Sequence, residues 1–276
     1  MKSDTPRPEP APDDGAHLRV LSCNILAGGS VSRYREYVTR SLEQVLPSGK
    51  RANLDELSRV IGGFDLVALQ ESDAGSLRSG FLNQTQYLAE TAGFPFWSDQ
   101  QNRRVSRLAA SGNGLLARIE PEEVRDYPLP GRIRGRGALW ARFGHGRDEL
   151  ILVVAHLSLG PTSRARQIGF LTELLGQHDH VILMGDLNTP LHRRELQPLF
   201  DRTALVPPHA ELPTYPSWRP ARALDYILTS ATVPVERRWV VPHPVSDHLP
   251  IAADIRMPRR IARAMGLDPQ ATTNGS

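Results

Sequence analysis

The sequence has a single cysteine, Cys23, among its 276 residues. No intrachain disulfide can form, which excludes a small domain stapled by disulfide bonds. No stretch approaches the roughly 20 apolar residues that a membrane-spanning helix needs. The sequence also has no Gly-x-Ser-x-Gly motif and no pair of histidines four residues apart, so neither a serine-hydrolase elbow nor a helical zinc site is indicated.

A large charge excess is also missing. The formal net charge is only +3, and the pI of about 9.3 reflects numerous arginines, which cluster at 103–107, 132–136 and 259–263. A hydrophobic content of 40% and a charged content of 23% are those of an ordinary globular protein. The charge permits an anionic substrate without requiring one.

The two ends of the chain differ in composition from its middle. Residues 1–16 are rich in proline and aspartate and lack the apolar core of a secretory signal, so we expect a disordered leader and a cytoplasmic protein. Residues 17–257 contain no Gly/Ser linker and predict one domain. Residues 258–276 predict a basic tail, either a short amphipathic helix in weak contact with an acidic membrane surface or a frayed cationic terminus. No obligate protein partner is indicated.

The central region alternates strand and helix patterns. Apolar runs bounded by Gly, Pro, Asn and Asp predict strands, and apolar residues spaced three and four apart predict helices. Asn53 is expected to cap the first helix, and the fully apolar run 150–156 is expected to lie centrally in a sheet. The strands are predicted at 18–24, 64–71, 114–118, 137–143, 150–156, 181–185, 224–228, 235–241 and 251–255, and the helices at 53–61, 77–92 and 163–176.

Polar residues able to carry chemistry stand at or near the ends of these strands, where a rigid sheet can direct them to one point. The last of them form the motif Ser246-Asp247-His248-Leu249-Pro250. The full set is Asn24, Glu71, His156, Asp186, Asn188, Asp225, Asp247 and His248.

These residue types favour a hard divalent cation. Glu71 and Asp247 offer carboxylate oxygens and Asn24 offers a neutral amide oxygen, a combination that suits Mg²⁺ or Mn²⁺ better than Zn²⁺. Asp186 and Asn188 are two residues apart, so on an extended segment both emerge on the same side. The carboxylate could orient or deprotonate a water molecule, while the amide donates to a phosphate oxygen.

The two histidines of the set, His156 and His248, could donate to phosphate oxygens or act as general acid or base. A metal ion, two imidazoles and an amide together would provide the positive field that phosphoryl transfer requires. Each residue of the set also has a structural alternative. Asp186 could form an Asx-turn, Asn24 could cap the next segment, and Asp225 could pair with Arg222.

The ordered combination of motifs resembles the endonuclease/exonuclease/phosphatase superfamily, which includes DNase I-like nucleases, apurinic-site endonucleases, neutral sphingomyelinases and inositol-polyphosphate 5-phosphatases. The resemblance implies an α/β four-layer sandwich of two mainly antiparallel β-sheets packed face to face, with helices outside and a divalent-metal site at one end. The matching segments run in the family's order: Ser22-Cys23-Asn24-Ile25, Leu69-Gln70-Glu71, Ser111 to Leu116, Ala155-His156-Leu157, Gly185-Asp186-Leu187-Asn188, Leu224-Asp225-Tyr226-Ile227 and Ser246 to Pro250.

The resemblance also implies roles. Glu71 is the expected principal metal ligand, with Asn24 and Asp247 in the same metal shell. His156 is the expected donor to the phosphate. Asp186 is expected to orient water, with Asn188 as its phosphate-binding partner. Asp225 is expected to orient His248, the second catalytic imidazole. Family mechanisms differ on whether the aspartate or the last histidine is the base.

The substrate side is less determined. Asn113 matches an asparagine at the edge of the family's site, Arg107 could bind a further phosphate, and Tyr215 and Trp218 could stack on a base, rest against a lipid interface or anchor their own loop. We expect a metal-dependent hydrolase of phosphodiesters, by direct attack of water, in nucleic acid or in a phospholipid or sphingolipid head group. The alternatives are a phosphomonoesterase acting on inositol phosphates or similar molecules, and a non-catalytic module that binds phosphorylated ligands.

Overall fold

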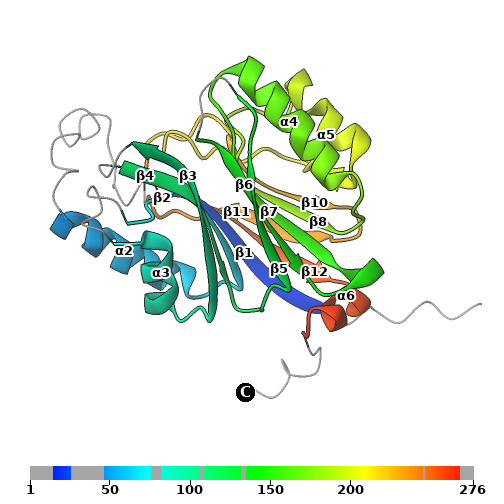
Figure 1. The fold of residues 1–276 in the computed structure, drawn as a ribbon, viewed down its shortest axis with the longest axis horizontal. Coiled ribbons are helices and arrows are strands. Elements are labelled where there is room, and N and C mark those ends of the chain that lie inside the picture. Colours follow the sequence, from blue (N-terminus) through cyan, green and yellow to red (C-terminus); the bar gives the residue numbers. More distant parts are fainter. Residues whose placement is uncertain are drawn as a thin grey trace, which may run out of the picture.

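Two six-stranded β-sheets form the centre of the molecule (Figure 1). The computed structural model describes residues 15–25, 47–75, 82–105, 109–131, 135–244 and 246–267. The first sheet has the strand order β11-β12-β1-β2-β4-β3, in which β1 and β2 are parallel and the other pairs antiparallel. Its strands are β1 (Ala16–Asn24), β2 (Leu66–Ser72), β3 (Phe96–Val105), β4 (Ala109–Ala117), β11 (Val235–Val240) and β12 (Ile251–Met257).

The second sheet has the order β5-β6-β7-β8-β10-β9, and here β7 and β8 are the parallel pair. Each sheet is therefore mixed but mostly antiparallel, with one parallel pair near its middle. The strands are β5 (Glu123–Pro128), β6 (Gly137–Phe143), β7 (Leu150–His156), β8 (Val181–Asp186), β9 (Leu205–Val206) and β10 (Asp225–Ser230).

The main core lies between the two sheets. Strand β7 shows why its sequence is continuously apolar: Leu152 and Val154 belong to the core shared with the first sheet, whereas Ile151 and Val153 belong to a second cluster beneath helices. A strand covered on both faces needs apolar side chains at odd and even positions alike. The first sheet is covered in the same way by a third apolar cluster.

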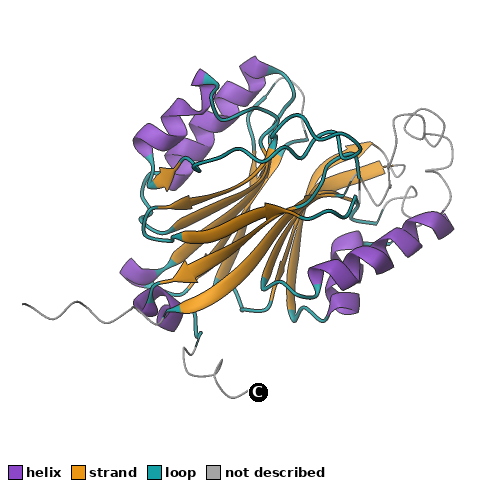
Figure 2. Ribbon diagram, turned by 180° about the vertical axis from the view of Figure 1, so that it is seen from behind, coloured by secondary structure: helices purple, strands orange, loops and turns teal. Residues whose placement is uncertain are grey.

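Helices cover the outer face of each sheet, which completes four layers (Figure 2). Leu54 and Leu88 pack one pair of helices onto the first sheet, and Ile168 and Leu199 pack the other pair onto the second. The first pair is α2 (Pro47–Ile61) and α3 (Gln84–Ala92), and the second is α4 (Pro161–Leu175) and α5 (Gln197–Arg202). The α/β sandwich implied by the resemblance is confirmed.

Some local predictions were wrong. Helix α2 begins at Pro47, so Asn53 lies within it and does not cap it. Strands β3 and β5 were missed because their sequences, Phe96–Val105 and Glu123–Pro128, are largely polar. The described part of the predicted 77–92 helix starts only at Gln84, after the cap residue Asn83.

The first residues of the predicted basic tail belong to the folded core. Helix α6 (Arg259–Ala264) buries Ile261 and Ala262 in the core between the sheets, and Met265 joins them. These apolar side chains are therefore covered by protein and are not presented to a membrane surface. The predicted boundary at 257 thus separates residues that share one core. Residues 1–14 of the predicted leader 1–16 lie outside the described residues, and Ala16 is the first residue of β1.

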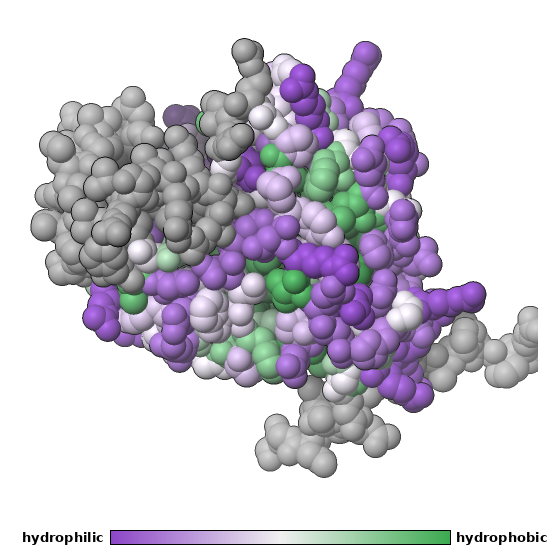
Figure 3. Space-filling model, in the orientation of Figure 1, coloured by the Kyte–Doolittle hydropathy of each residue, from purple (hydrophilic) through white to green (hydrophobic). Residues whose placement is uncertain are grey.

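Membrane-related features are few among the described residues. None of the described helices combines the length and hydropathy of a transmembrane segment. On the face drawn in Figure 3, the coloured apolar residues form small patches separated by polar ones.

Cys23 is 1% exposed in the cluster beneath α2 and α3, and burial raises the pKa of its thiol, as expected for a core residue.

Gly185 allows β8 to lie close to β7, and we predict that Gly185→Ala destabilises the fold. A Cβ at this position would lie 1.8 Å from the carbonyl oxygen of Ala155, and the backbone has φ +146°. Since backbone atoms would have to separate, the free energy of unfolding should fall by about 3 kcal/mol or more, measured by urea denaturation. Gly169→Ala in α4 is the control, because no atom lies within 4 Å of its added Cβ. Equal midpoints for the two variants would contradict the prediction.

Candidate functional site

The parallel strand pairs bring the predicted polar residues to one edge. In the first sheet Asn24 at the end of β1 is in register with Gln70, next to Glu71. In the second sheet Asp186 at the end of β8 is in register with His156 on one side and with Asp225 on the other. The crossover connections that make β1 parallel to β2 and β7 parallel to β8 therefore bring the ends of these four strands and the start of β10 together.

The carboxylate of Asp186 lies at the centre of this group. Its Oδ2 is 3.3 Å from Asn24 Nδ2, 3.4 Å from His156 Nε2 and 3.9 Å from His248 Nε2. Asp186 is 1% exposed, so these nitrogens surround a carboxylate that has almost no contact with bulk water. Asn24 comes from the first sheet, and its hydrogen bond to Asp186 joins the two sheets at the site.

His248 is oriented by a second buried carboxylate. Its Nδ1 lies 2.7 Å from Oδ2 of Asp225, and Thr214 Oγ1 donates to the same oxygen at 2.5 Å. With Nδ1 used in this way, the Nε2 of His248 is the nitrogen that faces Asp186. The sequence-based alternative that Asp225 pairs with Arg222 is replaced by this Asp–His pair.

Glu71 reaches the site through an irregular strand. Its φ of 59° is unusual for a residue with a side chain, and the β2–β4 register shifts between Leu69 and Ser72. Such bulges often turn a side chain to a new direction. The Oε1 of Glu71 lies 3.9 Å from His156 Nε2, so Glu71 too bridges the two sheets.

The segment after β8 agrees with both interpretations of its sequence, because Asp186 lies in the site and also forms a structural turn. The backbone N–H of Asn188 donates to Asp186 Oδ1 at 2.9 Å, which is the Asx-turn considered above. Asn188 has φ 53°, a conformation that asparagine tolerates. Its side-chain Nδ2 donates to the carbonyl of Leu157 at 2.9 Å, and that bond ties the segments after β7 and β8 together.

The late motif closes the site from the side of β12. Ser246 Oγ donates to the carbonyl of Asn24 at 2.5 Å and accepts from the His248 N–H at 3.0 Å. The carbonyl of Asp247 accepts the Ser217 N–H at 2.8 Å. The motif is thereby bonded both to the end of β1 and to the 213–218 segment, and Asp247 is left half-buried beside His248.

Burial and charge move the pKa values of the two histidines in opposite directions. Burial, together with the positive charges of Arg136 and His248, holds the pKa of His156 well below its usual range. Burial alone would also lower the pKa of His248, but the charge and hydrogen bond of Asp225, with smaller contributions from Asp186 and Asp247, raise it to about 10. One imidazole is therefore neutral and the other cationic near neutral pH.

The acids of the site are held in a low-dielectric environment. Burial and the neighbouring charge of Asp225 raise the pKa of Asp186 to about 7, against the opposing effect of His248 and of the Asn188 N–H. Burial likewise raises the pKa of Asp247. Acids whose anionic form is disfavoured in this way gain from a bound cation.

The donor set fits a divalent cation. Ligand atoms of Asp186, Asp225 and His248 all lie within 4.8 Å of one another, a buried grouping that could hold a metal ion. Asp225 Oδ2 already accepts from Thr214 and His248, which suits Asp225 to orienting His248, whereas the oxygens of Glu71 are hard ligands of the kind that a divalent cation takes. Asn24 at 3.3 Å from Asp186 belongs to the same group.

The residues predicted to contact substrate lie in different places. The Tyr215 ring packs against His248 with centroids 4.9 Å apart, and Trp218 is half-buried in the same segment. The amide nitrogen of Asn113 donates to Gln100, Gly137 and Val154, which links the two sheets beneath the site. Arg107 lies outside the described residues. Their contacts with substrate remain predictions.

Two supporting residues were missed from the sequence. Thr214 bonds Asp225, and Ser246 bonds both Asn24 and His248. Ser246 begins the late motif and Thr214 precedes Tyr215, but a hydroxyl residue in a sequence carries no signal of its hydrogen-bond partner. Only the fold shows which carbonyl or carboxylate each hydroxyl meets.

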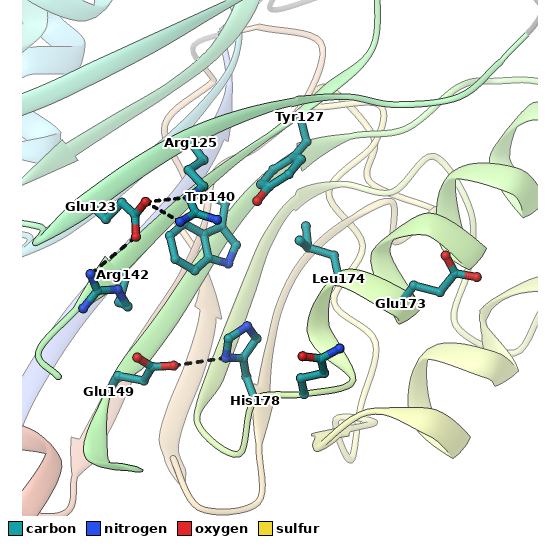
Figure 4. A pocket seen from close by; sticks show the side chains of 10 residues that line it. Glu123, Arg125, Tyr127, Trp140, Arg142, Glu149, Glu173, Leu174 and His178 are labelled. Atoms are coloured by element: carbon teal, nitrogen blue, oxygen red, sulfur yellow. Dashed lines mark hydrogen bonds and ion pairs between the residues drawn. The ribbon is translucent and has the colours of Figure 1, made fainter. Parts of the chain in front are cut away.

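A separate concavity lies on the outer face of the second sheet and contains none of the predicted site residues. It encloses about 380 Å³ between β5, β6 and the end of α4. Figure 4 shows Trp140 among ion-paired side chains, with Glu123 joined to Arg125 and Arg142, and Glu149 joined to His178. Since most of its charged groups are paired with one another, we place the chemistry at the strand ends.

Comparison with known proteins agrees with this geometry. The model of the Endonuclease/Exonuclease/phosphatase family matches residues 21–248, a span that runs from β1 to His248. The chain belongs to the endonuclease/exonuclease/phosphatase family. It is thus a phosphoesterase-family protein, and its buried Asp186, Asp225 and His248 grouping is consistent with the divalent metal on which enzymes of this family usually depend.

Solved structures of the family share the fold at low sequence identity. A family protein from Beutenbergia cavernae aligns with a TM-score of 0.67 at 19% identity, covering 87% of this chain and 72% of that one. A mannosyl-6-phosphatase from Bacteroides thetaiotaomicron aligns at 0.62 and 15%, covering 86% and 99%. Beta toxin from Staphylococcus aureus aligns at 0.61 and 16%, also covering 86% and 99%. A search of curated proteins found no match.

Because Asp225 raises the pKa of His248, we predict that Asp225→Asn lowers it. The amide keeps the shape but removes the negative charge, so in metal-free protein the pKa of His248 should fall from about 10 by about one to three pH units. Imidazole ¹⁵N chemical shifts followed over a pH series measure the change. Asp254→Asn is the control, because Asp254 pairs with Arg19 on the first sheet. A pKa of His248 that is the same in both variants would show that Asp225 does not set it.

Proposed function

We propose that this protein hydrolyses phosphodiesters by direct attack of water, in a site that holds Mg²⁺ or Mn²⁺. The observation that carries the proposal is the buried carboxylate of Asp186, surrounded by an amide and two imidazoles of unlike charge at the meeting point of both sheets. The proposed substrate class has a phosphate linked to two groups, as in nucleic acid or in a phospholipid or sphingolipid head group.

In this proposal the cation is held by Glu71, Asn24 and Asp247. Their oxygens are hard ligands, and the proximity of Glu71 to His156 and of Asn24 to Asp186 supports their belonging to one site. A bound divalent cation would supply positive charge to the non-bridging phosphate oxygens. The raised pKa of Asp247 supports the same assignment, since a cation would offset the burial of its carboxylate.

The protein side chains activate the water and bind the phosphate. Asp186 orients the attacking water and accepts its proton, while the Asn188 N–H holds the carboxylate in place through Oδ1. His156 donates a hydrogen bond to a phosphate oxygen. His248, with its Nδ1 held by Asp225, presents Nε2 as the donor that stabilises the developing negative charge. No covalent intermediate with the enzyme is required.

The surroundings of the site suggest how a substrate is held. Tyr215 packs on His248 and has Arg222 over its ring at 5.8 Å, so an aromatic and a cationic group stand beside the second imidazole. We propose that Tyr215 and Trp218 contact the group attached to the phosphate, that Asn113 supports the site from beneath, and that Arg107 binds a further phosphate. The basic residues of helix α6, Arg259, Arg260 and Arg263, are proposed to add only weak attraction to an acidic membrane surface, and the protein is proposed to act in the cytoplasm.

We predict that Asp186→Asn abolishes metal-dependent turnover. The full chain with Mg²⁺ or Mn²⁺ should hydrolyse bis(p-nitrophenyl) phosphate, EDTA should stop the reaction, and Asp186→Asn should lower kcat by about a hundredfold or more, since the amide cannot accept the proton of water. Asp254→Asn, remote from the site, should keep wild-type turnover. Release of nitrophenolate at 405 nm is the measurement.

A panel of natural esters then separates the substrate classes. Plasmid DNA, RNA, sphingomyelin and inositol phosphates are each offered with and without Mg²⁺. Turnover of p-nitrophenyl phosphate and inositol phosphates, without turnover of any diester, would replace the proposal by a phosphomonoesterase. Binding of these ligands with no metal-dependent turnover of any ester would replace it by a phospho-ligand-binding module. Cleavage of DNA that weakens steeply with added salt would indicate recognition through phosphates.

A further inference from the structure

A buried ion pair lies between the segments that follow β7 and β8. Arg164 is in the first turns of α4, and Glu195 is in a short 3₁₀ turn, Arg194–Leu196, that follows β8. Their side chains are only 9% and 14% exposed. Removing two charges from water costs free energy unless each finds several partners, so the contacts of this pair indicate its purpose.

The contacts of Arg164 reach the segment that carries His156. Its Nη1 donates to the carbonyl of Ser158 at 3.1 Å and to that of Leu159 at 2.8 Å. Its Nε and Nη2 both reach Glu195 Oε1 at 2.8 Å. The rigid guanidinium thus holds two backbone carbonyls on one side and a carboxylate on the other, a geometry that a lysine cannot reproduce.

The contacts of Glu195 reach the segment that carries Asp186. The same Oε1 accepts from Thr189 Oγ1 at 2.6 Å, three residues beyond Asp186. Two direct hydrogen bonds join the same segments, since the Leu157 N–H donates to the Asp186 carbonyl and Asn188 Nδ2 donates to the Leu157 carbonyl, both at 2.9 Å. The ion pair therefore connects, further from the site, two segments that are also hydrogen-bonded to each other at the site itself.

Gln167, one turn further along α4, holds the same segment from a second point. Its Oε1 accepts the Ser158 N–H at 2.8 Å, and its Nε2 donates to Ser158 Oγ at 2.9 Å. Gln167 has no exposed surface. The N-terminal part of α4 thus fixes the backbone just after His156, and Arg164 connects it to the segment after β8.

We propose that the Arg164–Glu195 pair, with Thr189, positions His156 and the Asp186–Asn188 turn relative to each other. The pair makes its contacts with Ser158, Leu159 and Thr189, not with the groups proposed to react, so these are positioning residues and not catalytic ones. The proposal rests on the function proposed above for the kinetic part of its test. Its structural part is independent of any activity.

The kinetic test compares conservative variants. Arg164→Lys and Glu195→Gln should each lower kcat for bis(p-nitrophenyl) phosphate by about tenfold to a hundredfold, with KM within about twofold of wild type, because geometry changes while the phosphate contacts remain. Thr189→Val, which removes one donor to Oε1, should have a smaller effect in the same direction. In Arg164→Lys protein, adding Glu195→Gln should cost little more, since the tie is already broken.

The matched control is the Arg125–Glu123 pair on β5, whose arginine side chain is 54% exposed. Arg125→Lys and Glu123→Gln should leave kcat and KM unchanged. Variants of Arg164 and Glu195 that melt at a lower temperature but keep wild-type kcat would overturn the positioning role and leave the pair as a stabilising contact only.

Amide hydrogen exchange tests the same role without turnover. In Glu195→Gln, the Leu157 and Asn188 amides, which bond to Asp186, should exchange about tenfold faster or more than in wild type. The Ile151 amide, bonded to His180 at the other end of the same strand pair, should be unchanged. Equal acceleration at Ile151, or none at Leu157 and Asn188, would overturn the proposal. If the wild type hydrolyses none of the esters but the expected exchange pattern is found, the proposed function is refuted and the positioning role of the Arg164–Glu195 pair stands.

Discussion

The burial of the Asp186 carboxylate is the constraint on which the rest of the site depends. A carboxylate removed from water is costly unless nearby groups stabilise its charge, and here those groups come from every part of the fold. Asn24 arrives from the first sheet, His156 from the neighbouring strand β7, and His248 from the segment before β12. The two sheets must therefore pack in one register for Asp186 to be accommodated, so the requirement of the site and the requirement of the fold coincide.

The strand topology meets this constraint with two local irregularities. Gly185 lets β8 approach β7 more closely than a residue with a Cβ would allow, immediately before Asp186. Glu71 adopts a left-handed backbone at a register shift in β2, which brings its carboxylate within 3.9 Å of His156. Unusual backbone conformations of this kind cost free energy and are characteristic of functional sites. Both occur at the edge where the sheets meet.

Much of this arrangement could be predicted from the sequence. Strands β6 and β7 end where their apolar runs end, and the order of motifs identified Asn24, His156, Asp186 and His248 before their positions were known. Strands β3 and β5 escaped prediction because their polar side chains hide the pattern. The bulge at Glu71 and the hydroxyl partners of Asp225 and Asn24 also escaped, since each depends on contacts between residues far apart in the chain. Periodicity reports which face of a strand is buried and carries no information about such contacts.

The two imidazoles show how one carboxylate can support two different kinds of donor. Both lie close to Asp186 and both are buried, yet only His248 has an acid of its own, Asp225, bonded to its far nitrogen. His156 is kept neutral by its burial, and the positive charges of Arg136 and of the cationic His248 add to that effect. The consequence is a fixed difference in protonation across a few ångströms. A neutral donor on one side and a charged donor on the other give the site a directional field, and a phosphate placed between them would find its negative charge drawn towards His248.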